Sequence, residues 1–463
     1  MQRRPQGCRQ QTIYLYYKSM FKQNIGLFVV ALLLCFSNIA KADDQGVTDS
    51  LSFTLEQTIS YAKQHSRELT VADLASQIAR RKTQEYTAQG LPQINGQISQ
   101  DYNYEIATFG VDEHGNPIQF GRKYSGNSTI RLSQMIFDGS FFVGLRASKS
   151  YQQLAVKQAE QSEITVKENV SKAYFLVLVN EESFQAIKRN YDRLEELLKE
   201  TAKMYEKGFA EKMDVDRIKV QLNNAEVELN QNRQETEISR MMLKFQMGMN
   251  LDQPLRLITR LEDQTYENVL EEVVHSSVSN RIEYSILESQ EHLKLLEQHQ
   301  NSYKYLPTLS LIGTYGYNNF GDDFASLTTF NTSYFASGAI GLQLNVPIFD
   351  GMLKHRTHQR LKLEQTQLGL QKANLRDQIQ IEMKQSQNTL VTSVRTVSIQ
   401  KDNMDLAAEV YKHAVAKYQR GLGSNLEVID ADNAFKTAQN NYYRAIYSAL
   451  VAKIELQKAM GSL

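Results

Sequence analysis

The chain has 463 residues, enough for about three ordinary domains, and its formal net charge of zero gives no reason to expect a nucleic-acid partner. It contains only six prolines, which predicts long uninterrupted elements. Because the sequence has neither a glycine-rich phosphate loop nor a nucleophile elbow, we expect no enzyme activity and no cofactor.

The first 42 residues have the pattern of a secretory signal peptide. Five basic residues and no acidic residue precede an apolar run at 25–36, and Ala40 and Ala42 form a small-residue cleavage site. We therefore expect cleavage before Asp43. A transmembrane anchor is the alternative, but this run of twelve residues is too short to span a bilayer.

Removal of residues 1–42 changes the composition of the chain. The segment holds six basic and no acidic residues, so the formal charge of the mature chain is −6. Both cysteines, Cys8 and Cys35, leave with it, which excludes a disulfide in the mature protein. A lipidated Cys35 is rejected because Leu34 before it is not small. Met20 is an alternative to the first methionine as the start of translation.

The second half of the chain repeats the first half. Four landmarks recur in the same order at an offset of 212 to 215 residues. They are Leu91-Pro92 and Leu306-Pro307, the tetrapeptide IFDG at 136–139 and 348–351, the segments 203–216 and 416–429, and the terminal Gly248 and Gly461. We therefore predict two tandem units, 43–253 and 254–463, with Pro254 in the linker.

Each unit is expected to contain a helix followed by two β-strands. The predicted strands are about 91–105 and 128–137 in the first unit, and about 307–318 and 337–347 in the second. All four alternate apolar and polar residues, and long polar loops at 106–127 and 319–336 join them in pairs. This pattern is typical of transmembrane β-strands, although a half-buried soluble sheet shows the same alternation. The signal peptide, the loops and the lack of an 18-residue apolar run favour the membrane.

Each unit is expected to end in a long helical hairpin, 139–248 in the first and 351–461 in the second. Both stretches lack proline and are rich in helix-forming Gln, Lys, Glu, Ala and Leu. Leu361, Leu368 and Leu375 recur every seven residues, which predicts a coiled-coil stripe. At 1.5 Å per residue, the first helix of the second hairpin would be roughly 100 Å long.

The repeated IFDG tetrapeptide is interpreted as the junction between a membrane strand and a long helix. Asp138 and Asp350 can accept hydrogen bonds from the free N–H groups at a helix start. Gly139 and Gly351 allow the chain to bend. Pro347 would end strand pairing at the second junction.

With these landmarks, the sequence resembles the TolC family of outer-membrane efflux channels over about 52–463. The resemblance is carried by Leu91-Pro92, Leu306-Pro307, "PIFDG" at 347–351, "AKYQRGLGSNLEVIDADNAF" at 416–435 and the terminal "KAMG". It implies a mixed α and β membrane protein in the outer membrane of a Gram-negative bacterium. It also implies a homotrimer, in which each chain gives four strands to a 12-stranded transmembrane β-barrel that a long periplasmic α-helical barrel continues.

The resemblance further implies a function and partners. Such channels are exit ducts of tripartite efflux or type I secretion systems, and they passively conduct drugs, metals or proteins, an activity of porin type. They lie in outer-membrane lipid and dock with a periplasmic adaptor (a membrane fusion protein) and an inner-membrane pump of RND or ABC type. The sequence does not identify the transported substrate or the pump.

Two acidic residues match the gate positions of the family. Glu427 and Asp430 correspond to a pair at the periplasmic entrance, and their i, i+3 spacing places both on one helix face. In a trimer they would form carboxylate rings, which favour cations and repel anions. The alternative is that both are ordinary solvated helix charges.

The resemblance also implies links that hold the gate closed. Asp214 and Tyr418 match an acidic residue and a tyrosine that the family pairs between its two hairpins. The arginine of a further family link is Gly423 here, and nothing in the sequence shows that nearby Arg420 replaces it. The glycines expected in the hairpin-tip turns, near the adaptor docking site, are Gly208, Gly421 and Gly423.

Two other interpretations stay open. His355 and His358 could share a helix face as metal ligands, but no third ligand is arranged as a zinc site requires, so we expect no metal. The chain could also be a non-transporting periplasmic coiled-coil scaffold or adaptor whose alternating runs form a soluble sheet. The four alternating strands and their doubled placement favour the duct.

Overall fold

The computed structural model describes residues 51–119, 121–259, 261, 277–324 and 334–463. The expected signal peptide, both cysteines and Met20 lie outside these residues. Ser50–Leu463 form one compact body, which contains both repeated units. Among the described helices, none is both long enough and apolar enough to cross a membrane.

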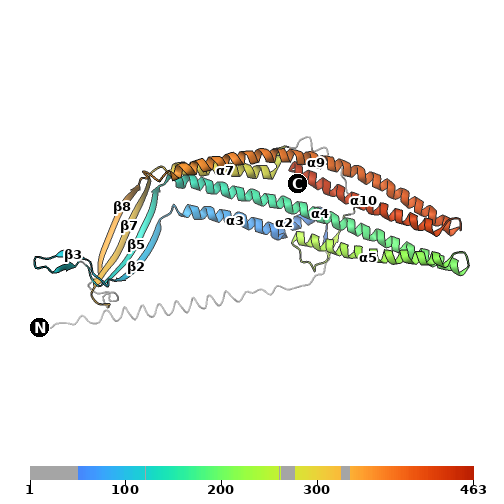
Figure 1. Cartoon of the computed structure of the whole chain (residues 1–463), viewed down its shortest axis with the longest axis horizontal. Helices are drawn as coiled ribbons and strands as arrows, with labels where there is room; N and C mark the ends of the chain where they lie inside the picture. Colours follow the sequence, from blue (N-terminus) through green and yellow to red (C-terminus); the bar gives the residue numbers. More distant parts are fainter. Residues whose placement is uncertain (1–50, 120, 260, 262–276, 325–333) are drawn as a thin grey trace, which may run out of the picture. The chain divides into compact units, whose positions relative to one another are not determined.

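The two halves of the chain contain matching elements in the same order (Figure 1). In the first half these are α3 (Arg67–Ala88), β2 (Gln93–Tyr102), β5 (Tyr124–Phe137), α4 (Gly139–Glu206) and α5 (Lys212–Met247), and α2 (Leu55–His65) precedes them. In the second half they are α7 (Ile282–Tyr303), β7 (Thr308–Gly321), β8 (Tyr334–Asn345), α9 (Leu353–Gln419) and α10 (Asn425–Met460), and η3 (Val278–Asn280) precedes them. The lengths also match: α4 and α9 have 68 and 67 residues, and α5 and α10 have 36 each.

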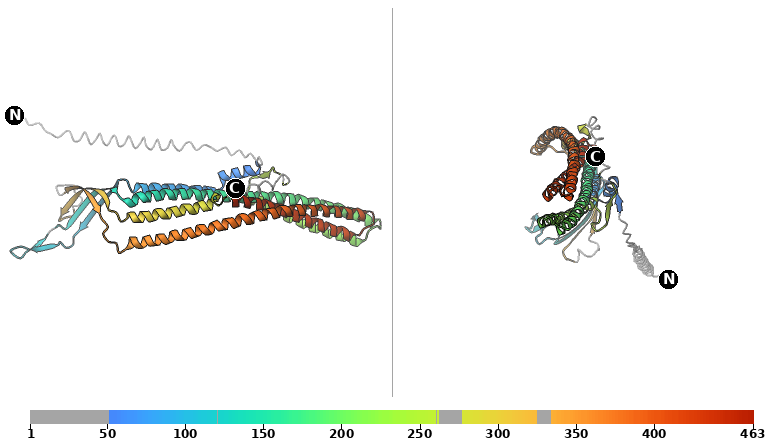
Figure 2. Two further views of the ribbon diagram at one scale, coloured as in Figure 1. Left: turned by 90° about the horizontal axis from the view of Figure 1, so that it is seen from above. Right: turned by 90° about the vertical axis from the view of Figure 1, so that its right-hand side faces the viewer.

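The long helices form two hairpins that pack against each other. α5 packs along the second half of α4, and α10 packs along the second half of α9, while α10 also contacts α4 (Figure 2). The halves of α4 and α9 nearer the sheet pack against shorter helices. There α3 packs on α4, and α7 packs on both α4 and α9. Of the stripe predicted on α9, Leu361 is buried, and Ile379 and Leu390 continue the buried face.

The first strand–helix junction is closely packed. The carboxylate of Asp138 caps α4 by accepting hydrogen bonds from the N–H groups of Ser140 (2.8 Å) and Phe141 (3.3 Å). Gly139 is the first residue of α4 and does not have a left-handed conformation. A Cβ atom there would lie 2.8 Å from the ring of Tyr303, so this glycine permits the close approach of α7.

The second junction is built differently, although it has the same sequence. β8 ends before Pro347, and Gly351 (φ 65°) and Met352 (φ 68°) both adopt left-handed conformations before α9 begins. The carboxylate of Asp350 accepts a hydrogen bond from the N–H group of Lys354 (3.1 Å) and lies 3.1 Å from the Nζ atom of the same residue. A left-handed conformation is uncommon for a residue such as methionine, and the first junction has no residue in this conformation.

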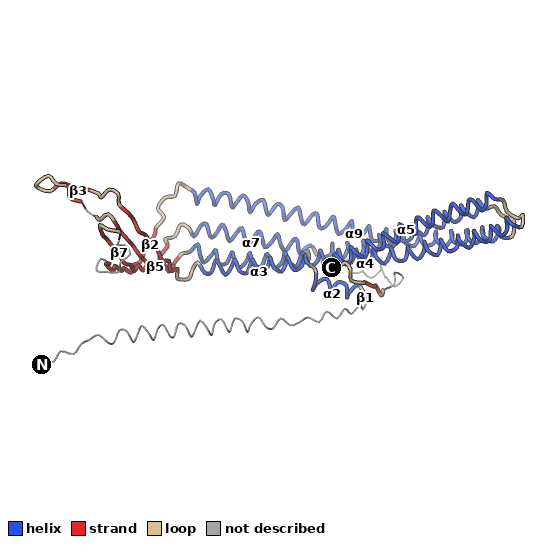
Figure 3. Tube along the Cα trace, turned by 90° about the horizontal axis from the view of Figure 1, so that it is seen from below, coloured by secondary structure: helices blue, strands red, loops and turns tan. Residues whose placement is uncertain are grey.

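The four long strands form one antiparallel sheet in the order β2–β5–β7–β8, drawn in red in Figure 3. The two halves of the chain therefore join through β5 and β7. The register places the large apolar side chains of neighbouring strands beside one another on one face. They are Ile94, Ile98, Ile130, Leu132, Leu311, Tyr315, Tyr317, Ile340 and Leu342. The opposite face carries mainly Gln, Asn, Ser and Thr.

Two short pairs of strands were not predicted. β3 (Thr108–Val111) and β4 (Pro117–Gln119) form a hairpin inside the long polar loop predicted at 106–127, and Asp112 fixes its turn by accepting hydrogen bonds from two backbone N–H groups. β1 (Leu51–Phe53) pairs in parallel with β6 (Leu255–Leu257), which ties the start of the first unit to the start of the second. All four strands have only three or four residues, which is too short for their periodicity to be recognised.

The main apolar core lies where the two units meet. Val170 and Tyr174 of α4, Leu243 of α5 and Leu450 of α10 are fully buried there. The hydroxyl group of Tyr174 donates a hydrogen bond to Thr259 Oγ1 (2.9 Å), so the only polar atom of this side chain is satisfied. The core therefore joins both hairpins and the β6 region.

A glycine ends the returning helix of each hairpin against the backbone of a preceding segment. Gly248 and Gly461 both have φ of 73°. A Cβ atom at Gly248 would lie 2.1 Å from the carbonyl oxygen of His65, and one at Gly461 would lie 2.7 Å from that of Asn280. The same close contact thus occurs once in each unit.

We expect Gly248→Ala to destabilise the protein much more than Gly208→Ala. Both residues are left-handed, which costs an alanine about 1 kcal/mol, but a Cβ atom at Gly208 would meet nothing within 4 Å. At Gly248 the clash with His65 adds to this, for a total of about 3 kcal/mol. Thermal unfolding in detergent, followed by circular dichroism, measures the difference. Equal losses in the two variants would contradict the close contact.

Candidate functional site

The turns that close the two hairpins have the same geometry. Gly208 (φ 78°) and Gly421 (φ 73°) have left-handed conformations. The N–H group of the residue after each glycine donates a hydrogen bond to a carbonyl group in the last turn of the preceding helix. Phe209 donates to the carbonyl of Met204 (2.8 Å), and Leu422 donates to that of Lys417 (2.9 Å). These contacts form the glycine-dependent helix ending known as the Schellman motif. The turns leave Phe209 and Leu422 77% and 78% exposed.

Glu427 and Asp430 lie on the exposed surface of α10, immediately after the second turn. Ser424 caps this helix, because its hydroxyl group accepts a hydrogen bond from the N–H group of Glu427 (3.2 Å). Neither carboxylate forms an ion pair within the described part of the chain. Both are therefore available to solvent, to ions or to another chain.

Asp214 and Tyr418 lie near each other but are not hydrogen-bonded. The carboxylate of Asp214 accepts from the N–H group of Glu211 (3.1 Å) and caps α5. Burial raises the pKa of the Tyr418 hydroxyl, the charge of Asp214 adds to this rise, and the nearby hydroxyl of Thr201 lowers it. The contact between the hairpins is made instead by Asn425, whose side-chain amide donates to the carbonyl oxygen of Asp214 (2.8 Å).

The position of the family's arginine leaves little room for a side chain. Gly423 does not have a left-handed conformation. A Cβ atom there would lie 3.1 Å from Cβ of Lys417 and 3.3 Å from the backbone nitrogen of Tyr418. Arg420 is exposed and forms no ion pair in the described residues, so it does not supply the missing link within this chain.

Four buried residues join the hairpins beside the turns. Leu197, Ile218, Tyr418 and Val428 come one each from α4, α5, α9 and α10, and they form a single apolar cluster. At its edge, the side-chain amide of Gln419 donates to the carboxylate of Glu200 (2.8 Å). The base of the turns is therefore a packed four-helix contact that holds the start of α10 in place.

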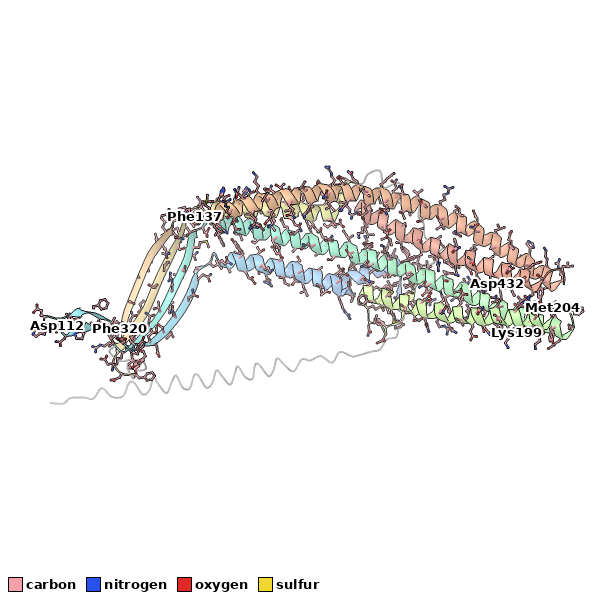
Figure 4. The ribbon with its side chains drawn as sticks, viewed as in Figure 1. Asp112, Phe137, Lys199, Met204, Phe320 and Asp432 are labelled. Carbon is pink, nitrogen blue, oxygen red and sulfur yellow. The ribbon has the colours of Figure 1, made fainter. Side chains whose placement is uncertain are left out.

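A buried charge on α10, which was not predicted from the sequence, lies near a second contact between the hairpins. Asp432 is 2% exposed, and the Nζ atom of Lys436 lies 3.1 Å from its carboxylate. Nearby, the guanidinium of Arg193 on α4 lies over the rings of Tyr411 and Phe435, 5.6 and 5.5 Å from their centroids. Figure 4 marks Asp432 on α10, in the part of the hairpins toward the turns.

The signal for this buried charge was present in the sequence. Val428, Asp432 and Phe435 follow one another at helical spacings of four and three, so a carboxylate occupies a position on an apolar face. Asp432 is only two residues after Asp430, and two residues rotate the side chain by about 200° around a helix. The carboxylate of Asp432 is therefore buried between the helices, while that of Asp430 is exposed. Burial and the charge of Asp432 raise the pKa of Tyr411, and Arg193 lowers it.

The two histidines considered as metal ligands contact amides instead. Nε2 of His355 lies 3.1 Å from the Gln359 amide, and Nε2 of His358 lies 3.3 Å from the Gln298 amide. Within the described residues, no group of three or more His, Cys, Asp or Glu side chains is arranged to hold a metal ion.

Comparison with known families identifies the chain. The model of the outer membrane efflux protein family matches residues 58–249 and 285–462, one range within each half of the chain. The chain belongs to this family. Its members are channel proteins of the outer membrane, so this is an outer-membrane efflux protein with a doubled fold. The resemblance to the TolC family stated from the sequence is thereby confirmed.

Solved structures share the fold at low sequence identity. The outer membrane protein VceC from Vibrio cholerae is 17% identical, with a TM-score of 0.69, and the match covers 88% of this chain and 96% of that one. The Campylobacter jejuni CmeC outer membrane channel is also 17% identical, with a TM-score of 0.70 and coverage of 88% and 85%. The open-state MtrE outer membrane channel of Neisseria gonorrhoeae is 16% identical, with a TM-score of 0.68 and 88% of each chain covered. A search of curated proteins gave no match.

We expect Lys436→Met to lower the free energy of unfolding by roughly 2 to 4 kcal/mol, because it leaves the buried carboxylate of Asp432 without its partner. Lys199→Met is the matched control. Lys199 forms an i, i+4 pair of similar length, 3.2 Å, but both of its side chains are largely exposed, so the loss should stay below about 1 kcal/mol.

Hydrogen exchange of the α10 amides locates the effect, and thermal unfolding gives its size. In the double variant Asp432→Leu/Lys436→Met, much of the stability should return, since replacing a buried ion pair by apolar groups is often neutral. Equal behaviour of the Lys436 and Lys199 variants would show that Asp432 is not stabilised by its ion pair.

Proposed function

We propose that this chain is the exit duct of a tripartite efflux or type I secretion system, and that it works as a homotrimer. The observation that carries this proposal is the sheet, which has an apolar face across all four strands and outer edges, at β2 and β8, that pair with no other strand among the described residues. A transmembrane barrel needs at least about eight strands, so one chain cannot close it. Three copies give the twelve strands that the family resemblance implies.

The two faces of the sheet have different roles in this proposal. The apolar face contacts lipid, and the polar face lines the lumen. Because β5 leads into α4 and β8 into α9, closing the strands around an axis also places the helical hairpins around that axis. The hairpins then continue the duct as a periplasmic helical barrel.

Conduction through the duct is passive. The sequence has no nucleotide-binding motif, so an inner-membrane pump of RND or ABC type supplies the energy and a periplasmic adaptor couples the two. The exposed Phe209 and Leu422 of the hairpin turns are the apolar side chains nearest to such an adaptor. Interfaces of this kind are centred on a few buried apolar anchors.

Glu427 and Asp430 act as the gate in this proposal. They are exposed on one face of α10, and a trimer repeats them three times at the narrow end of the duct. Rings of carboxylates favour cations over anions. The closed gate is held by packing at Asn425 and around Val428, because the direct link from Asp214 to Tyr418 is absent within the chain.

We expect Glu427→Ala/Asp430→Ala to reduce cation selectivity and to raise conductance at least about twofold, because six carboxylates leave the narrowest section. Purified trimers in a planar bilayer provide the measurement. The control is Asp405→Ala/Glu409→Ala, an exposed acidic pair on α9 away from the turn, which should leave both properties unchanged.

The outcomes separate the competing functions. Discrete conductance steps that the gate substitution does not alter would keep the duct and remove the gate assignment. Folded protein that gives no conductance, or a mature protein that is freely soluble, would favour the alternative of a periplasmic coiled-coil scaffold or adaptor.

A further inference from the structure

The polar face of the sheet is almost free of charge. Its residues on the four strands are neutral apart from Asp101 on β2 and Arg131 on β5. Arg131 is exposed and forms no ion pair in the described part of the chain. A cation without a partner on an otherwise neutral wall is unusual, since exposed charges normally lie among charges of both signs.

No carboxylate lies beside Arg131 in the sheet. It is directly opposite Asn95 on β2 and Thr314 on β7, and Thr314 is opposite Ala339 on β8. Asp101 is six residues beyond Asn95 on the same strand, which corresponds to roughly 20 Å. This exceeds the Debye length of about 8 Å at physiological ionic strength, so Asp101 does not neutralise Arg131.

The neighbouring polar groups are occupied with one another. The hydroxyl of Thr129 donates to the side-chain oxygen of Asn127 (2.6 Å), and the amide of Asn127 donates to Asn318 (2.7 Å). The amide of Asn318 in turn donates to Ser337 (3.3 Å). These hydrogen bonds run across three strands near Arg131. The guanidinium of Arg131 has no ion-pair partner among the described residues, and it is the only cation on this face of the four strands.

We propose that Arg131 forms an anion-attracting ring inside the β-barrel and is a specificity-determining residue of the duct. This rests on the proposed function, because a trimer brings three copies of Arg131 to the same level of the lumen. Rings of arginine or lysine favour anions in pores, as rings of carboxylates favour cations. Guanidinium groups also pair bidentately with carboxylates and phosphates, so the favoured solutes carry such groups.

The test is the reversal potential of trimers in a planar bilayer under a KCl gradient at low ionic strength. The acidic gate lies in series, so the parent protein is Glu427→Ala/Asp430→Ala. We expect Arg131→Gln to lower the permeability ratio of chloride to potassium at least about twofold, with a smaller change at high salt because the ring is then screened. Arg131→Lys should keep the ratio, since it keeps the charge.

Arg122→Gln/Asp322→Asn is the matched control. Arg122 is also an arginine near the sheet, but it is paired with Asp322, so removing both charges keeps the net charge and should not shift the ratio. Inorganic triphosphate, added on the barrel side, gives a second readout. It should block the parent transiently and block Arg131→Gln at least about tenfold more weakly, since three guanidinium groups are lost.

The results distinguish a failure of the arginine ring from a failure of the proposed duct. Conducting Arg131→Gln trimers with the parent's permeability ratio and the parent's block by triphosphate would overturn the ring while leaving the duct intact. If properly folded wild-type trimers do not conduct, the proposed function and the ring fall together.

Discussion

The fold is governed by a sheet that one chain cannot complete. Its apolar face is open to the surroundings, so that Ile98 and Ile340 on the two outer strands are 77% and 85% exposed, and its outer edges have no partner within the described chain. Neither feature is stable in water, and an open edge is not tolerated in lipid. Both features support the proposal that neighbouring copies complete the sheet in a bilayer.

The sheet is continuous with the long helices. β5 passes directly into α4 through the cap at Asp138, and β8 reaches α9 after a short bend at Gly351. The direction of each strand therefore sets the direction of a helix of nearly seventy residues. The helices of the two hairpins are equal or nearly equal in length, and both returning helices end at a left-handed glycine, Gly248 or Gly461.

The periodicity of the sequence predicted the long helices and strands. The short strands and the packing around the site depend on contacts between residues distant in sequence, which no local pattern predicts. The period of two in the strands and the proline-free helical stretches each extend over many residues, so both are readable without a structure. The parallel pair of β1 and β6 joins segments two hundred residues apart, and no local pattern reports it. Within the site, the positions of Glu427 and Asp430 followed from the family motif. Their support by Asn425 and Asp432 depends on the packing of four helices, which the motif does not contain.

The two charged rings proposed for the duct lie far apart along it. Arg131 and the pair Glu427 and Asp430 lie at opposite ends of α9, a helix of 67 residues that spans roughly 100 Å. This is about ten times the Debye length at physiological salt, so each ring acts on a solute independently of the other. A small ion of either sign meets one unfavourable ring on its way out. A solute that carries both positive and negative groups is repelled less by either ring. The same holds for a large solute that contacts the wall through apolar surface while a pump drives it. In the proposed trimer, the two rings therefore restrict the passive leak of small ions more than they restrict energised export.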